Sequence, residues 1–411
     1  MENIYDVLKE RDLIKQITFE EEFKEMVSNK KTSVYLGIDP TADSIHIGHF
    51  IPLMMMSYFQ KCGHRPIILI GGGTAFIGDP SGKTDMRKML SSDGMEQNFE
   101  GIKKAVSRFI KFDGDNPAIL VGNAEWMDKL SFVEFQRLVG VHFNVNTMLS
   151  ADAYANRIKE GGLTFLEMGY MLMQSYDFVH LNEKYGCTLQ IGGADQWGNI
   201  VSGSDLFRKM KNNNTISSKD EAIYGLTCPL LLTKEGKKMG KTEKGTLWVD
   251  KEKTSPYDFY QYFYNVSDDD VPMLLRRFTR TPLDEIERMC RENIIEAKKY
   301  MASSLTELVH GKDEMENVKK MVDSLFLSSQ SGSSAPESEF VIQDETIGVL
   351  DLFALSGFIS SKSEARRLIE QGGAAVDGEK ITDVQTVVSK NGRSYVLLKK
   401  GKKGFLKVKW S

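Results

Sequence analysis

The sequence predicts an α/β fold built on a parallel sheet, followed by a mainly helical region and a small α+β unit. Two observations predict the sheet. Apolar runs that end at or near Gly or Asp are typical of buried strands, and they occupy residues 33–38, 67–71, 118–121 and 188–191. Segments with helical periodicity lie between these runs, and such alternation indicates parallel strands joined by right-handed crossovers. Ligands of such sheets bind at the carboxyl ends of the strands.

The composition is that of an ordinary globular protein. The 411 residues suffice for two or three domains, and 41% of them are hydrophobic and 27% charged. No run approaches the roughly 20 apolar residues that cross a bilayer, so we expect no membrane contact. The four cysteines form no CxxC pair and no metal-ligand spacing, which indicates reduced thiols and a cytoplasmic location; they are Cys62, Cys187, Cys228 and Cys290.

We expect four regions along the chain. Residues 1–223 carry the strand–helix alternation, and residues 224–326 carry mostly helical signals, with charged amphipathic segments at 268–277 and 283–308. Residues 327–341 begin with LSSQSGSSAP, a small polar stretch without apolar periodicity, which we interpret as a flexible linker. Residues 342–411 form a separate compact unit.

The predicted C-terminal unit combines two short helices with a strand–turn–strand pair. Residues 347–355 are typical of a short helix, and Ser361 with Glu364 is typical of a capping box that opens a second helix. A double glycine then closes that helix. An Asp-Gly turn separates strands expected at 374–376 and 380–381.

The first chemical motif is residues 37–49, GIDPTADSIHIGH, in which a strand ends at Asp39 and a helix opens near His46. The backbone N–H groups and the dipole of a helix N-terminus favour a polyphosphate, and the glycine between His46 and His49 lets a nucleotide approach the backbone. Two such histidines are alternatively metal ligands, but no third ligand of the right type is nearby, so we expect no protein metal site. Ordinary polar surface is the other alternative.

The second motif is residues 71–84, GGGTAFIGDPSGKT, which invites comparison with a P-loop but departs from it. A P-loop requires four residues between its glycines before Gly-Lys-Thr, whereas Gly78 and Gly82 enclose only three. We interpret the stretch as a glycine-rich strand end that brings Asp79 to a cation and brings Lys83 and Arg87 to phosphates. The alternative is a plain turn with solvated charges.

The third motif is a polar stripe on a mainly apolar helix at residues 165–179. Tyr170, Gln174 and Asp177 follow at spacings of four and three and therefore share one face. Such a stripe is costly to bury without partners, and a small polar ligand would supply them. The alternative is that the protein itself supplies the partners.

Two further motifs are weak when each is taken alone. Residues 190–199, QIGGADQWGN, follow a strand and contain Asp195, an acid of the kind that holds ribose hydroxyls. Residues 237–242, KKMGKT, place Lys238 and Lys241 on either side of a glycine and before Thr242, which suits a mobile loop that closes on a triphosphate. A solvated basic loop is the alternative interpretation.

All five motifs, in this order, resemble the class I aminoacyl-tRNA synthetases. HIGH at 46–49 matches the family signature, and KMGKT at 238–242 is similar to the KMSKS loop, with Gly for the first Ser and Thr for the second. Within the class, VYLGID at 34–39, IGDPSGK at 77–83 and GGADQWGN at 192–199 are similar to the bacterial tyrosyl-tRNA synthetases. The C-terminal unit resembles an S4 RNA-binding domain. The resemblance covers the chain from about Asp6 to the end.

The resemblance implies a Rossmann-like parallel-sheet catalytic domain with an inserted dimerisation segment, an α-helical domain that begins with the KMSKS-like loop, and a small α+β S4-like domain. It implies ATP-dependent activation of L-tyrosine to tyrosyl-adenylate and transfer of the tyrosyl group to tRNA(Tyr). The implied partners are L-tyrosine, ATP, tRNA(Tyr) and a second copy of the chain in a homodimer. Mg²⁺ is expected to accompany the triphosphate.

By resemblance, Tyr35 and Asp177 read the substrate phenol, a group that both donates and accepts a hydrogen bond. The other implied tyrosine contacts are Asp79, Tyr170 and Gln174, which hold the ammonium group, and Gln190. The implied nucleotide contacts are Gly37, Asp39, His46, His49, Gly193, Asp195, Gln196 and Lys241. The tyrosine carboxylate is already an anion, so its attack on the α-phosphate needs positioning and charge stabilisation but no general base. The residues assigned to that task are Thr41, His46, His49, Lys83, Arg87, Lys238, Lys241 and Thr242.

The charge distribution agrees with an RNA contact at the C-terminal end. From residue 341 onward the chain has 12 Lys and Arg against 8 Asp and Glu, although the whole chain has a net charge of −4. A positively charged C-terminal unit in an otherwise negatively charged chain is typical of an RNA-binding region. The candidate phosphate contacts are Lys362, Arg366, Arg367, Lys399, Lys400, Lys402 and Lys403. Solubility is the alternative role for each lysine.

Three rival interpretations agree less well with the sequence. A tryptophanyl or other class I synthetase is disfavoured by the pair of Tyr35 and Asp177 and by the S4-like tail. A noncatalytic RNA-binding protein of the same fold would have a broken HIGH or KMSKS element, and neither is broken here. A small nucleotidyltransferase with a His-x-Gly-His motif has no evident use for the second basic loop and the tail.

Overall fold

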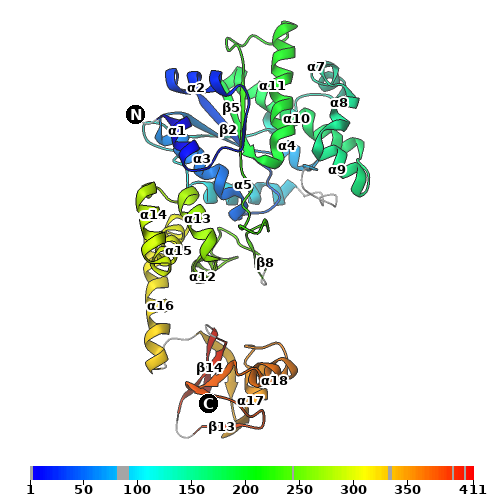
Figure 1. Cartoon of the computed structure of the whole chain (residues 1–411). Helices are drawn as coiled ribbons and strands as arrows, with labels where there is room; N and C mark the ends of the chain where they lie inside the picture. The colour runs from blue at the N-terminus through cyan, green and yellow to red at the C-terminus, as the bar shows by residue number, and fades with distance from the viewer. Residues whose placement is uncertain (1–2, 81–91, 243–244, 332–335, 391–392, 402–403) are drawn as a thin grey trace. The chain divides into compact units, whose positions relative to one another are not determined.

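The computed structural model describes residues 3–80, 92–242, 245–331, 336–390, 393–401 and 404–411. The chain forms two compact units, residues 1–312 and residues 313–411 (Figure 1). Within the described residues, no helix is both long and apolar enough to cross a lipid bilayer.

A six-stranded sheet is the centre of the first unit. Its strand order is β1-β6-β5-β2-β3-β4; every neighbouring pair from β6 to β4 is parallel, whereas β1 pairs antiparallel with β6. The strands are β1 (Gln16–Ile17), β2 (Ser33–Ile38), β3 (Arg65–Ile70), β4 (Ile119–Gly122), β5 (Cys187–Gly193) and β6 (Tyr224–Cys228). The predicted parallel sheet is confirmed. β2 has its predicted bounds, and the ends of β3, β4 and β5 differ from the prediction by one or two residues.

Strand β6 extends the sheet domain beyond its predicted end. It pairs in parallel register with β5, from Tyr224 opposite Leu189 to Cys228 opposite Gly193, and it is almost wholly buried. The expected domain boundary after residue 223 was therefore wrong. The glycine and threonine of YGLTC interrupt its apolar run, so the segment lacks the pattern of a buried strand.

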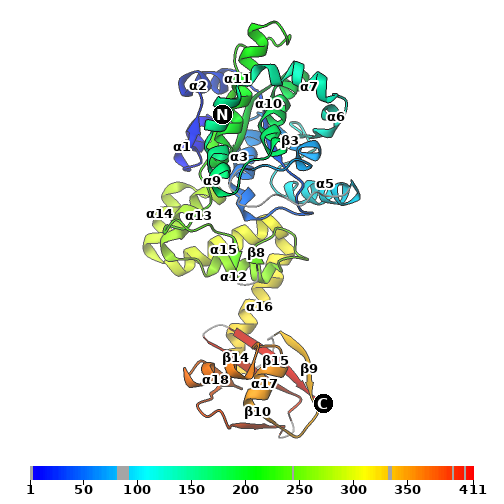
Figure 2. The same cartoon turned by 90° about the vertical axis from the view of Figure 1, so that its right-hand side faces the viewer.

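Helices cover both faces of the sheet (Figures 1 and 2). The four central strands are buried along nearly their whole length, which requires cover on both faces. Helix α3 (Phe50–Lys61) is buried at every position from Phe50 to Phe59 and packs against β2, β3 and β5. Helix α10 (Phe165–Tyr185) packs against α11 (Trp197–Asn212) and β5. The other helices here are α1 (Ile4–Glu10), α2 (Glu20–Asn29), η1 (Ile47–His49), α4 (Gly72–Ala75), α5 (Ser92–Val106), α6 (Ala124–Met127), α7 (Phe132–Leu138), η2 (Gly140–His142), α8 (Val145–Ser150), α9 (Asp152–Glu160) and η3 (Ala194–Gln196).

The segment after β6 is mainly helical, as predicted. It contains the two-residue strands β7 (Lys241–Thr242) and β8 (Gly245–Thr246), then α12 (Pro256–Tyr264), η4 (Asp268–Asp270), α13 (Val271–Phe278), α14 (Leu283–Glu292) and α15 (Ile294–His310). Hydrogen bonds join this segment to the sheet domain. Arg11 Nη1 and the Tyr58 hydroxyl both donate to the carbonyl oxygen of Thr279, at 2.8 and 3.0 Å.

The linker predicted at residues 327–341 was wrong at both ends. Helix α16 spans Lys312–Ser331 and therefore includes the first residues of that stretch, and strand β9 spans Glu337–Ile342. Serine and glutamine propagate a helix that a preceding amphipathic segment has already nucleated, so LSSQS need not break it. Residues 332–335 lie outside the described residues.

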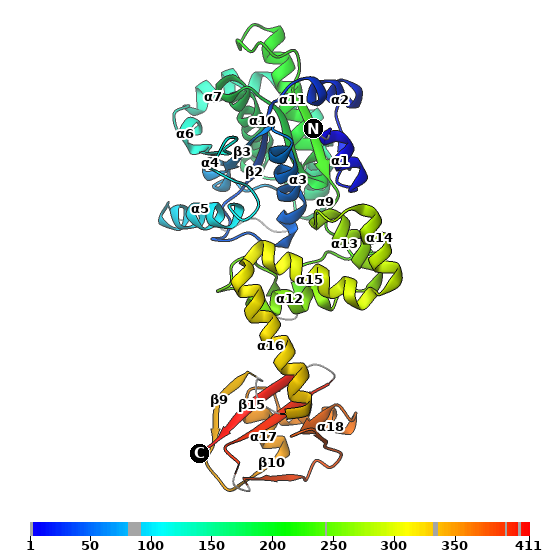
Figure 3. The same cartoon turned by 90° about the vertical axis from the view of Figure 1, so that its left-hand side faces the viewer.

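In the second unit, the described residues form α16, two small sheets and two shorter helices (Figure 3). The five-stranded sheet has the order β12-β11-β14-β15-β9, and β10 pairs with β13. These elements are β10 (Thr346–Gly348), α17 (Val349–Leu355), α18 (Lys362–Glu370), β11 (Ala374–Val376), β12 (Glu379–Lys380), β13 (Val387–Ser389), β14 (Tyr395–Lys400) and β15 (Gly404–Trp410). The predicted α+β architecture is confirmed. Asp377 and Gly378 both have positive φ, 50° and 88°, as a tight hairpin turn requires.

The predicted capping box of α18 is only half formed. The Ser361 hydroxyl accepts a hydrogen bond from the Glu364 backbone N–H at 3.2 Å. The Glu364 carboxylate does not return to the cap backbone; it accepts from the Ser360 hydroxyl at 2.5 Å and from Lys400 at 3.2 Å. The tertiary partner Lys400 therefore competes for the carboxylate that the local motif would use.

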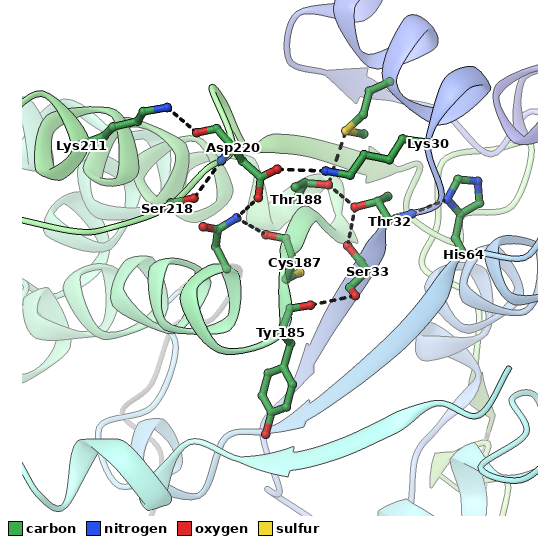
Figure 4. A network of polar contacts seen from close by, with 12 residues as sticks. Lys30, Thr32, Ser33, His64, Tyr185, Cys187, Thr188, Lys211, Ser218 and Asp220 are labelled. Carbon is green, nitrogen blue, oxygen red and sulfur yellow. Dashed lines mark hydrogen bonds and ion pairs between the residues drawn. The ribbon is translucent and has the colours of Figure 1, made fainter.

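A network of polar contacts joins the amino ends of β2 and β5 to their neighbours (Figure 4). The Asn182 amide donates to the Asp220 carboxylate at 2.9 Å, and the hydroxyls of Thr32 and Thr188 contact each other. The Thr32 N–H donates to His64 Nδ1 at 3.3 Å. Burial lowers the pKa of His64 to about 4, so the ring is a neutral acceptor. This network stabilises the sheet at the end opposite the carboxyl ends of the strands.

Candidate active site

A cavity of about 510 Å³ opens at the carboxyl ends of β2, β5 and β6. This is the position that a parallel sheet predicts for a ligand. The cavity brings together residues from all five sequence motifs. The nominated residues that line it are Tyr35, Gly37, Asp39, Thr41, His46, His49, Asp79, Tyr170, Gln174, Asp177, Gln190, Gly193, Asp195, Gln196 and Lys238.

Four nominated residues are not placed at this cavity. Lys83 and Arg87 lie outside the described residues. Lys241 and Thr242 form strand β7, and only their backbone is described. Their nominated roles therefore remain predictions.

The buried end of the cavity holds Tyr35 and Asp177. Their exposed fractions are 1% and 2%, and the Tyr35 hydroxyl has no hydrogen-bond partner among the described residues. The Asp177 carboxylate accepts from Trp126 Nε1 at 2.8 Å and from Asn123 Nδ2 at 3.0 Å. Burial raises the pKa of Asp177 to about 7, although both donors oppose that shift. Burial, and then the Asp177 charge, raises the pKa of Tyr35 well above its ordinary value.

Asn123 and Trp126 are site residues that the sequence interpretation missed. Asn123 directly follows β4, and its side-chain oxygen accepts from the Gly73 N–H at 2.8 Å. Trp126 stacks on His180, with ring centroids 4.3 Å apart and planes 22° from parallel. The available signal was a polar residue just after the carboxyl end of a predicted strand, where ligand-binding side chains gather.

A second carboxylate, Asp39, is held beside the first. Tyr170 donates to Asp39 Oδ2 at 3.1 Å, and Thr74 donates to Asp39 Oδ1 at 3.0 Å. Asn123 Nδ2, which donates to Asp177, also donates to the Thr74 hydroxyl at 3.1 Å. One chain of hydrogen bonds therefore joins the two carboxylates and orients both toward the cavity.

The middle of the cavity is lined by amides and one more acid. Gln196 Nε2 donates to Asp79 at 2.6 Å, and Gln174 Nε2 donates to Gln196 Oε1 at 3.4 Å. The side-chain oxygens of Gln174 and Gln190 are buried without a hydrogen-bond partner among the described residues. The polar stripe on α10 therefore has protein partners, as the alternative interpretation required, but the side-chain oxygen of Gln174 in the stripe and that of Gln190 on β5 are left for a ligand.

The His-x-Gly-His motif lines a more exposed part of the cavity, where His46 and His49 are partly buried and Gly48 is exposed. The Gly48 N–H donates to His46 Nδ1 at 3.0 Å, and the rings of His46 and His49 are 4.4 Å apart. A Cβ at position 48 would lie 2.7 Å from the His46 ring. The glycine therefore serves the fold of the motif itself, in addition to the close approach of a ligand that the sequence suggested.

The segment that follows the basic loop is hydrogen-bonded to this motif. Ile47 N–H donates to the Leu247 carbonyl at 3.2 Å, and Val249 N–H donates to the Ile45 carbonyl at 3.0 Å. Lys238 is exposed and lines the cavity. Burial and the neighbouring Asp79 raise the pKa of Asp195, whereas Lys238 opposes that shift. The cavity thus has an acidic and amide-rich interior and a rim with histidines and lysine, an arrangement suited to a zwitterionic amino acid inside and phosphates at the rim.

Comparison with known proteins assigns this arrangement to a class. The family model described as "tRNA synthetases class I (W and Y)" matches residues 27–327. A second model, described as "Tyrosine--tRNA ligase SYY-like C-terminal domain", matches residues 329–408. The parallel sheet, with the His-x-Gly-His motif and the basic loop at one cavity, is that of a class I tRNA synthetase.

Similarity to individual proteins indicates one family within this class. The chain is 47% identical over 411 residues to the tyrosine--tRNA ligase of Clostridium tetani, with 99% of this chain and 98% of that protein covered. It is 48% identical over 415 residues to that of Clostridium kluyveri, with 99% of each covered. A C-terminally truncated mitochondrial tyrosyl-tRNA synthetase from Aspergillus nidulans aligns with a TM-score of 0.71 and 29% identity, covering 79% of this chain and 95% of that one. The chain belongs to the tyrosine--tRNA ligase family.

Proposed function

We propose that this chain activates L-tyrosine with ATP and transfers the tyrosyl group to tRNA(Tyr). The pair of Tyr35 and Asp177 carries the choice of substrate. A bound phenol would donate to the Asp177 carboxylate and accept from the Tyr35 hydroxyl, which has no partner among the described residues. Phenylalanine would leave both buried groups without that partner, and an unpaired buried polar group is costly.

The amino group of the substrate fits the middle of the cavity. An ammonium has three N–H donors and no acceptor. The unpartnered side-chain oxygens of Gln174 and Gln190, together with the Asp79 carboxylate, supply acceptors for it. Tyr170 donates to Asp39, so we assign it to orienting that carboxylate as well as to the ammonium subsite.

The first reaction is a displacement at the α-phosphorus of ATP. An oxygen of the tyrosine carboxylate forms the new P–O bond, the bond to the bridging oxygen breaks, and pyrophosphate leaves with the electron pair. Positioning and charge stabilisation supply the catalysis. We assign the phosphate contacts to Thr41, His46, His49, Lys83, Arg87, Lys238, Lys241 and Thr242. We assign the adenosine and adenylate contacts to Gly37, Asp39, Gly193, Asp195 and Gln196.

Mg²⁺ enters this proposal as part of the nucleotide substrate. Among the described residues, no group of three or more His, Cys, Asp or Glu side chains is placed to hold a metal ion. We propose that the ion is coordinated mainly by phosphate oxygens and water, as Mg²⁺ commonly is. The ion supplies neutralisation of the triphosphate charge.

The C-terminal unit is our proposed tRNA contact. Arg366 and Arg367 are both exposed on α18, and no ion pair of either is found among the described residues. Lys362 pairs with Asp351, and Lys400 pairs with Glu364 at 3.2 Å, so these lysines would exchange partners on binding. Lys399 lies over the Phe405 ring. The nominated Lys402 and Lys403 lie outside the described residues.

We propose that two copies of the chain form a homodimer through the helices between β4 and β5. Large apolar side chains are exposed on consecutive elements of this insertion, including Val141 at 71% and Phe165 at 67%. The others are Phe132, Val133, Val145, Ile158 and Leu166. An apolar surface of this kind is typical of an interface, and a two-fold pairing would bury it on both copies. Figure 1 shows α7, α8 and α9 gathered together.

We also propose a cytoplasmic location. The four cysteines are free thiols, which suits a reducing compartment. Fractionation of the native cell with an antibody against the chain would test this location.

Pyrophosphate exchange into ATP, run separately with each of the twenty amino acids, tests the proposed activity. We expect exchange with tyrosine and none above background with phenylalanine or tryptophan. Exchange that is supported equally by phenylalanine would refute the assignment of the phenol contacts. Exchange with no amino acid at all would refute the proposed activation reaction.

A further inference from the structure

Gly240 occupies a junction between three parts of the first unit. It lies between Lys238 and Lys241 of the basic loop. Its N–H donates to the hydroxyl oxygen of Tyr262 on α12 at 2.8 Å, and its carbonyl accepts from the Leu247 N–H at 2.8 Å. The loop backbone is therefore bonded to the helical domain at the point that separates its two lysines.

The third part at this junction is the His-x-Gly-His motif. Gly240 is buried and has a φ of +91°, and a Cβ placed on it would lie 2.7 Å from Cγ1 of Ile47. A side chain at position 240 would therefore be strained and would push the loop away from the motif. This explains why glycine stands at the loop position whose role the sequence left open.

The loop has room to move if this bond is lost. A second cavity, of about 1020 Å³, lies beside the loop and is lined by Tyr262, Lys237 and Met239 among others. Two other hydrogen bonds hold the loop before Gly240, and neither involves Tyr262. Lys234 N–H donates to Asp270 at 2.7 Å, and Met239 N–H donates to the Leu231 carbonyl at 3.0 Å. Loss of the Tyr262 hydroxyl would therefore free the Gly240 N–H and loosen this segment, while the bonds of the Gly240 carbonyl and the Met239 N–H still hold the loop in place.

We propose that Tyr262 is a positioning residue for adenylate formation: its hydroxyl oxygen holds the Gly240 N–H so that the loop lysines face the triphosphate. The inference rests on the proposed role of the loop lysines. Tyr262 acts through the loop backbone, because it lines the cavity beside the loop and is not among the residues that line the proposed substrate cavity. The effect should therefore fall on the chemical step and not on tyrosine binding.

The test compares Tyr262→Phe with Tyr257→Phe in the full-length chain. The first substitution keeps the ring and removes the acceptor. Tyr257 is a partly buried tyrosine of the same helix with no contact to Gly240 described, so it serves as the matched control. We expect Tyr262→Phe to lower the single-turnover rate of tyrosyl-adenylate formation about tenfold, since the buried N–H loses its partner. The tyrosine Kd and the control variant should be unchanged.

Hydrogen exchange gives a second readout that a general loss of stability would not mimic. Deuterium uptake should rise in the peptide that contains Gly240 and stay the same in peptides from the sheet. An unchanged adenylation rate in Tyr262→Phe, with a reduced rate in Lys238→Ala, would overturn the positioning role alone. Unchanged rates in both variants would instead overturn the proposed role of the loop.

Discussion

The indole N–H of Trp126 donates a 2.8 Å hydrogen bond to Oδ1 of Asp177. Asn123 donates to the other carboxylate oxygen at 3.0 Å, so the acid has a defined orientation before any ligand binds. Both donors come from the start of the insertion that follows β4, whereas Asp177 comes from α10. A carboxylate that is held in this way needs little reorganisation to accept a phenol, which favours specificity over adaptability.

Replacement of Asp177 by alanine should remove the acceptor for the substrate phenol. We expect the tyrosine Kd to rise at least about a hundredfold, because a charged hydrogen bond is lost and the phenol is left unpaired at the buried end of the cavity. Isothermal titration calorimetry measures this change. ATP binding is the internal control and should be retained. Undiminished tyrosine affinity would show that the phenol binds elsewhere.

Replacement of Trp126 by phenylalanine should have a smaller effect of the same kind. Phenylalanine keeps a ring to stack on His180 but has no N–H for Asp177. We expect tyrosine binding to weaken roughly tenfold, less than in Asp177→Ala, since Asn123 still holds the carboxylate. Calorimetry measures the tyrosine Kd of both variants. An equal or larger increase in Kd for Trp126→Phe than for Asp177→Ala would contradict this account.

Tyrosine affinity should depend on pH near neutrality. Burial raises the pKa of Asp177 to about 7, and a phenol donates to the carboxylate but not to a protonated acid in the same geometry. Binding must therefore displace a proton at lower pH, so the Kd should rise by about a factor of ten for each pH unit below the pKa. Calorimetry between pH 5.5 and 8.5 measures the profile, and Asp177→Asn should flatten it.

The same pKa gives a stability prediction with a definite sign. The value in the folded protein, about 7, exceeds the ordinary 3.8, so the folded chain holds a proton that the unfolded chain has released between these values. The associated stabilisation is complete below the lower value and is lost as pH rises through the higher one. Asp177→Asn should therefore be stabilised relative to the parent more at pH 8 than at pH 4, as urea unfolding can measure. A constant difference across this range would contradict the raised pKa.

Lys241→Ala should slow adenylate formation without weakening tyrosine binding. The lysine is assigned to the triphosphate, so the rate of adenylate formation should fall by about a hundredfold or more while the tyrosine Kd stays nearly constant. Single-turnover measurements with saturating ATP give the rate. Lys253→Ala is a useful comparison, because Lys253 forms an ion pair with Asp43 at 2.8 Å and is not among the residues that line the substrate cavity. Equal rates in the two variants would argue against the loop assignment.

Truncation after residue 331 should spare tyrosine activation but impair the charging of tRNA(Tyr). The first compact unit holds the whole described cavity, so pyrophosphate exchange with tyrosine should be retained. Charging of tRNA(Tyr) should fall strongly, because the basic C-terminal unit is absent. Full charging by the truncated chain would rule out the proposed RNA role of that unit, and reversal of Arg366 and Arg367 to glutamate in the full-length chain offers an independent check.

Much of the site could be predicted because its residues sit in contiguous motifs. The stripe of Tyr170, Gln174 and Asp177 follows from helix geometry alone, and these side chains all line the cavity. Strand β6 was missed because Gly225 and Thr227 break its apolar run. The linker was misplaced because composition does not reveal where an established helix will stop.

By itself the sequence determined the parallel sheet, the order of its motifs and the chemical character of the groups at its carboxyl ends, because periodicity and motif spacing are local properties of the chain. Only the tertiary structure decided which atoms meet. Trp126 and Asp177 are 51 residues apart in sequence, and Gly240 and Tyr262 are 22 apart. Such pairs depend on the register of strands and the packing of helices, which bring distant residues within hydrogen-bonding distance and leave no local pattern behind.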